Sequence, residues 1–181
     1  MLNALSLSIA TIAVLMAFAL LFFKFIPGSG DKFHKLPREQ KLGFALTVIC
    51  MGISYYYGEL LFGPEYPVVA KFLPILIPAA TVLSYFYLDY LFTRAVCGAL
   101  FLLTAHLLEH AFTEALPFRI LLTISCLSVN LFAMILTAQP WRFRDAVMKA
   151  SKEITYAKKA AGVFALHALL ILIPLASSYV L

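Results

Sequence analysis

Six apolar stretches, each long enough to cross a lipid bilayer, make up most of this chain of 181 residues. They cover residues 2–26, 41–62, 67–88, 95–113, 117–138 and 162–181. A helix rises about 1.5 Å per residue, so about 17–25 residues are needed to cross the hydrocarbon core. Hydrophobic residues make up 63% of the chain and charged residues 13%. A water-soluble fold of this size could not bury so much apolar surface, so we expect an integral membrane protein.

The stretches are continuously apolar, which predicts helices rather than barrel strands. Strands of a membrane barrel alternate apolar and polar residues with a period of two, and a run such as residues 9–23 has no such alternation. The sequence therefore predicts an all-α protein, a bundle of six transmembrane helices. No segment outside the stretches is long enough for a hydrophobic core of its own. Residues 1–181 are therefore expected to form a single transmembrane helical domain.

The segment between the fifth and sixth stretches, residues 141–161, is amphipathic. Apolar side chains recur there at helical spacing: Phe143, Val147, Ala150, Ile154 and Ala157. Charged side chains lie on another face, so we expect an amphipathic interfacial helix on the cytoplasmic side of the membrane. The residues predicted to contact lipid at this interface are Trp141, Arg142, Arg144, Lys149, Lys152 and Lys159. A partner protein that binds the same helix is the alternative.

Basic residues are unevenly shared between the two sides of the predicted bundle. If the N-terminus lies outside, twelve of the fourteen lysines and arginines flank the inner loops, and only Lys71 and Arg119 lie outside. Basic residues are retained on the cytoplasmic side during insertion. We therefore expect both termini on the outer side of a bacterial cytoplasmic membrane. The same topology explains the basic pI near 9.2 without nucleic-acid binding and makes anionic lipid an expected contact.

The fourth stretch carries the main cluster of ionisable residues. His106, Glu109 and His110 are three and four residues apart, so a helix places them on one face. Ionisable side chains within a membrane usually face the bundle interior or water, and Glu59 of the second stretch is expected on the same outer side. Two histidines four residues apart can bind one metal ion. These four residues are the candidate proton or metal site, and hydrogen bonding that only fixes helix packing is the alternative.

A haem b is a further alternative for the histidines. His106 and His110 lie on one helix face and cannot approach opposite faces of one porphyrin, so the second ligand would be His167 of the sixth stretch. The predicted depths of His106 and His167 differ by roughly 7 Å. Asn130 of the fifth stretch is predicted at about the depth of His167, which favours an Asn130–His167 hydrogen bond that packs the two helices.

No complete catalytic motif is present in the sequence. We therefore expect a non-enzymatic membrane subunit or scaffold, with membrane lipid and partner membrane proteins as its contacts and no cofactor. The alternative is a redox or transport protein that uses a haem b, a proton or a divalent metal at the His/Glu cluster of the fourth stretch.

Overall fold

The computed structural model describes residues 4–27, 36–113 and 118–177, and these residues are helical throughout apart from short connections. The π-helix η1 continues the first α-helix, and the 3-10 helix η2 precedes the second. The elements in chain order are α1 (Ala4–Leu20), η1 (Leu21–Phe25), η2 (Leu36–Arg38), α2 (Gln40–Glu65), α3 (Pro67–Tyr87), α4 (Leu91–Thr113), α5 (Arg119–Ala138), α6 (Trp141–Lys152) and α7 (Ile154–Ser177). The structure therefore agrees with the predicted all-α class.

Within the described residues, five helices are long and apolar enough to cross a membrane, which supports the predicted membrane class. They are α1 with η1, α3, α4, α5 and α7. The second predicted stretch corresponds to α2, which is not among these five although it has 26 residues. Three consecutive tyrosines, Tyr55 to Tyr57, and the carboxylate of Glu59 interrupt its apolar character. The beginning of the fifth predicted stretch, at residue 117, lies outside the described residues.

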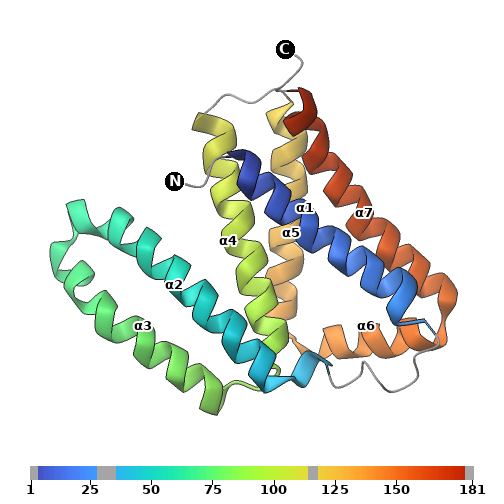
Figure 1. Cartoon of the computed structure of the whole chain (residues 1–181), viewed down its shortest axis with the longest axis horizontal. Helices are drawn as coiled ribbons and strands as arrows, with labels where there is room; N and C mark the ends of the chain where they lie inside the picture. Colours follow the sequence, from blue (N-terminus) through green and yellow to red (C-terminus); the bar gives the residue numbers. More distant parts are fainter. Residues whose placement is uncertain (1–3, 28–35, 114–117, 178–181) are drawn as a thin grey trace.

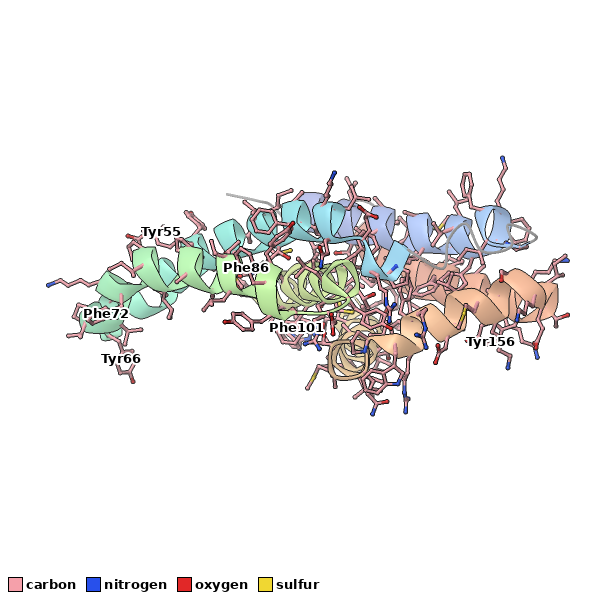
Figure 2. The ribbon with its side chains drawn as sticks, turned by 90° about the horizontal axis from the view of Figure 1, so that it is seen from below. Tyr55, Tyr66, Phe72, Phe86, Phe101 and Tyr156 are labelled. Carbon is pink, nitrogen blue, oxygen red and sulfur yellow. The ribbon has the colours of Figure 1, made fainter. Side chains whose placement is uncertain are left out.

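The long helices alternate in direction between the two ends of the molecule (Figure 1). The start of α1 and the ends of α4 and α7 lie at one end, whereas α6 crosses the opposite end beneath α5 and α7. The α2–α3 hairpin packs on α4 through α2 and leans away from the remaining helices. Seen from the α6 end, the molecule is elongated, and Tyr66 and Phe72 lie at the far edge of the hairpin (Figure 2).

The core has two apolar clusters that join the helices other than the hairpin. One joins α1, α4, α5 and α7 through side chains such as Leu15, Leu107 and Ile171. The other lies nearer α6 and includes Phe22 and Phe143, which are 2% and 5% exposed. The second cluster fixes α6 across the end of the bundle.

The predicted amphipathic helix over residues 141–161 is divided in the structure. Helix α6 ends at Lys152, Glu153 has extended backbone with φ −117° and ψ 101°, and α7 begins at Ile154. Ile154, predicted on the apolar face of this helix, is 60% exposed. The reason is tertiary packing, because α6 and the first turns of α7 pack on the same apolar cluster from two directions. One straight helix could not make both contacts.

Candidate functional site

The polar cluster of α4 lies against α2. The ring of His106 stacks on the ring of Tyr57, with 3.5 Å between ring centroids and 26° between ring planes. The Nδ1 atom of His106 lies 3.6 Å from Oε2 of Glu109, which is too long for a good hydrogen bond. The His106 side chain is 13% exposed, whereas that of Glu109 is 71% exposed. His106 therefore faces the α2–α4 contact and Glu109 faces outward.

The structure brings together only part of the predicted His/Glu cluster. Glu59 is exposed, and the side chain of His110 lies outside the described part of the structure. Among the described residues, no group of three His, Cys, Asp or Glu is close enough to hold a metal ion. The Nε2 atom of His106 is buried and has no hydrogen-bond partner in the described structure. The sequence does not predict the stacking of Tyr57 on His106, because this contact depends on how α2 and α4 pack.

Asn130 and His167 have partners other than the predicted ones. The hydroxyl of Thr104 on α4, which is fully buried, donates a hydrogen bond to Oδ1 of Asn130 on α5. Nδ1 of His167 lies 2.8 Å from the carbonyl oxygen of Val163 in the same helix. That contact places the proton on Nδ1, because a carbonyl oxygen only accepts. The Asn130–His167 hydrogen bond is therefore replaced by an α4–α5 contact, since His167 is satisfied within α7.

His106 and His167 have different surroundings in the described structure. His106 contacts Tyr57 of α2, whereas His167 lines a groove of about 630 Å³ between α5, α6 and α7. We call this the α5–α6–α7 groove. The arrangement gives no geometric support to a haem held by these two histidines.

The floor of the α5–α6–α7 groove is apolar and aromatic. Leu15, Phe22 and Leu100 line its buried side. Phe164 of α7 also lines the groove, and its ring centroid lies 5.7 Å from that of Phe22 and 6.0 Å from that of Phe132. The groove is therefore suited to an apolar chain.

The opposite side of the groove is open. The exposed lining residues are Ser128, Phe132, Ile135, Arg142, Lys159 and Val163. They belong to α5, α6 and α7, whereas α1 lies on the closed side. An occupant could therefore enter laterally from the surrounding membrane, without passing through the bundle.

The structure separates the six predicted lipid-contact residues into three groups. Arg142 and Lys159 line the groove. Arg144 and Lys149 have partners within the chain, described below. Trp141 and Lys152 are exposed at the surface of α6. The six residues predicted to contact lipid therefore differ in their surroundings.

Arg144 and Lys149 are held by neighbouring side chains. Arg144 donates to Oδ1 of Asp145 at 2.8 Å and to the hydroxyl oxygen of Tyr90 at 3.1 Å. The hydrogen bond to Asp145 raises the pKa of the Arg144 guanidinium. The Nζ atom of Lys149 lies 4.9 Å from the ring centroid of Tyr156, in a cation–π contact between α6 and α7. Both cations therefore have a partner within the chain.

The groove itself could have been anticipated in part from the sequence. Lys159, Val163 and His167 are four residues apart in turn, so they lie on one face of α7. The contribution of α5 and α6 depends on how these helices pack, and no residue spacing in the sequence predicts it.

Comparison with models of known protein families, with curated proteins and with solved structures found no match for this chain.

Proposed function

We propose that this chain is a non-enzymatic multipass membrane protein that acts as a subunit or scaffold. The α2–α3 hairpin is the element that receives a partner membrane protein. The observation that carries this proposal is the isolation of α3. Only 17% of its span is buried inside the chain, the lowest share among the five apolar spans of the described residues, in which the others range from 22% to 39%. Its main packing partner is α2, so its other faces are available.

Exposed apolar residues alone would not support a partner, because lipid covers them equally well. The prolines of α3 add a second reason. Pro74 and Pro78 have no N–H, so they cannot donate to the carbonyl groups of Ala70 and Pro74 four residues earlier. Carbonyls freed by proline within a membrane are commonly satisfied by neighbouring helices. A polar side chain on a partner helix beside Pro74 and Pro78 would supply that donor.

The proposal includes six membrane crossings, which are the five apolar helices named above and α2. A helix of 26 residues is about 39 Å long, enough to cross the hydrocarbon core. Its direction between α1 and α3 also fits an alternating path (Figure 1). With the basic loops inside, both termini lie on the outer side of a bacterial cytoplasmic membrane, and α6 lies along the cytoplasmic interface.

Site-specific photocrosslinking tests the hairpin assignment. A photoreactive residue is placed at Phe72 or Ile75, which are 62% and 70% exposed on α3. The matched control is Leu131 of α5, which is 61% exposed. We expect a discrete protein adduct from both α3 positions and only lipid adducts from Leu131. Lipid adducts alone at all three positions would refute the proposal.

A second candidate function is proton or divalent-metal handling at the α4 polar cluster. It is favoured by the buried, unpartnered Nε2 of His106 beside Tyr57. A metal ion bound at Nε2 would give this nitrogen a partner, and the negative charge of Glu109 on the Nδ1 side of the ring would favour a positively charged occupant.

The variant Glu109→Gln keeps the side-chain shape and removes the charge. For the second candidate, we expect weaker binding of Zn²⁺ to the purified chain. Unchanged Zn²⁺ binding would leave the cluster with a packing role only.

A further inference from the structure

We propose that the α5–α6–α7 groove is a binding site for one anionic glycerophospholipid taken from the bilayer. Its phosphate lies between Arg142 and Lys159, and one acyl chain lies against Phe132 and Phe164. The inference goes beyond general contact with the membrane surface, because it assigns the lipid to one groove and to two of the basic residues. It does not depend on the hairpin proposal.

The apolar lining fits a hydrocarbon chain. The groove volume of about 630 Å³ is within the range of about 300–1,000 Å³ typical of sites for small molecules. Phe164 is held by stacking on Phe18, with 5.5 Å between ring centroids, so the aromatic floor is fixed by the core. A chain lying on Phe164 would exchange bilayer contacts for a fixed aromatic surface.

The charges at the groove identify the head group. Neither Arg142 nor Lys159 has a carboxylate partner among the described residues, whereas Arg144 is paired with Asp145. Both lie at the open side of a mostly apolar groove. The negative charge of a lipid phosphate would be attracted to both, with a bidentate contact from the arginine and a point-charge contact from the lysine.

The order of the lining residues also matches the orientation of a lipid. Arg142 lies in the first turn of α6, which crosses the end of the bundle (Figure 1). His167 is eight residues beyond Lys159 in α7, or about 12 Å along the helix. The charged residues therefore lie toward the membrane surface, and the apolar lining extends inward. A lipid of the leaflet on the α6 side would enter with its phosphate at the charged end.

Native mass spectrometry of the full chain tests the assignment. The probes are phosphatidylglycerol and phosphatidylcholine with identical acyl chains, added to the purified protein in mild detergent. We expect wild type to retain phosphatidylglycerol preferentially. The double variant Arg142→Gln with Lys159→Gln should lower that retention by about fivefold per residue, or roughly thirtyfold in all. Its retention of phosphatidylcholine should change less, because the choline cation opposes the attraction of that lipid to the two basic residues.

Lys152→Gln with Lys158→Gln is the matched control, because both lysines are exposed and neither lines the groove. It removes the same net charge and should retain phosphatidylglycerol as wild type does. An equal loss in both double variants would show general electrostatic attraction and overturn the proposal. Equal retention of the two lipids by wild type would overturn it as well.

A third variant tests the apolar part of the site independently of charge. Val163→Trp places a bulky ring at the open side of the groove, where Val163 is 55% exposed. We expect a loss of phosphatidylglycerol retention with an unchanged elution volume and unfolding temperature. This variant also replaces the charge variants if they fail to fold. Normal retention by folded Val163→Trp would place the lipid elsewhere and refute the proposal.

Discussion

Gly43→Ala is expected to force apart α2 and the start of α4. A Cβ atom on Gly43 would lie 2.5 Å from the backbone nitrogen of Phe92 and 2.8 Å from the carbonyl carbon of Leu91. Ordinary contact begins at 3.4 Å, so the two backbones would have to separate by about 0.9 Å. Such overpacking costs about 1–3 kcal/mol. Against this, alanine is favoured over glycine within a helix by about 1 kcal/mol.

Gly52→Ala on the same helix isolates the effect of the close approach. A Cβ atom at Gly52 would meet nothing within 4 Å, so this variant keeps the helix-propensity gain without the clash. The free energy of unfolding of Gly43→Ala should therefore lie about 1–3 kcal/mol below that of Gly52→Ala. Thermal unfolding of the two variants in one detergent measures the order of their stabilities.

Cys50 provides a local measurement of the same contact. Its thiol donates to the carbonyl oxygen of Ala95 at 3.7 Å, between α2 and α4. We expect faster maleimide labelling of Cys50 in Gly43→Ala than in Gly52→Ala. Two results together would refute the close approach of the α2 and α4 backbones at Gly43. Gly43→Ala would unfold at the same temperature as Gly52→Ala or higher, and Cys50 would be labelled at the same rate in both variants.

Three further predictions concern other contacts and the topology. Thr104→Val removes the hydrogen bond to Asn130 and should lower the unfolding free energy by about 0.6 kcal/mol, and at most about 1.7; unchanged unfolding would mean that the bond contributes nothing. Tyr90→Phe removes the acceptor shared by two arginines and should speed hydrogen exchange in α6, and unaltered exchange would contradict it. Reporter fusions at Asn3 and Leu181 should both report the outer side, and a cytoplasmic signal from either would reject the proposed topology.

Hydropathy predicts which segments are apolar better than it predicts where helices begin. The third predicted stretch, residues 67–88, agrees closely with α3, Pro67–Tyr87. The reason is that Pro67 marks the start of the helix and the polar residue Asp89 follows its end. The sixth stretch was predicted from residue 162, yet α7 begins at Ile154. Lysines such as Lys158 and Lys159 reduce hydropathy but are good helix formers. A helix can therefore extend well beyond the apolar run that reveals it.

The candidate sites show the same division between local and tertiary information. The proximity of His106 and Glu109 follows from their spacing of three residues on one helix. The choice of Thr104 rather than His167 as the partner of Asn130 depends on the packing of α4 on α5. The sequence predicts at what depth in the membrane Asn130 lies. It does not predict which neighbouring helix faces Asn130 at that depth.

The break at Glu153 determines which residues form the groove, so its cause is worth testing. Because the chain turns there, Lys159 is placed on α7 and lines the groove together with Arg142 of α6. Glutamate is itself a good helix former, so local propensity does not explain the break. Packing does, because Ala150 and Ala157 on its two sides are both fully buried.

Two substitutions separate these explanations. Glu153→Ala should change the unfolding free energy by less than about 0.5 kcal/mol, because it leaves the packing on both sides of the break intact. Ala157→Leu should lower it by about 1–3 kcal/mol through overpacking and should speed hydrogen exchange in α6, since the added side chain must displace that helix. Lipid retention in the groove should fall with Ala157→Leu and not with Glu153→Ala. The opposite order would mean that the backbone at Glu153 sets the corner by itself, and that the buried alanines only follow it.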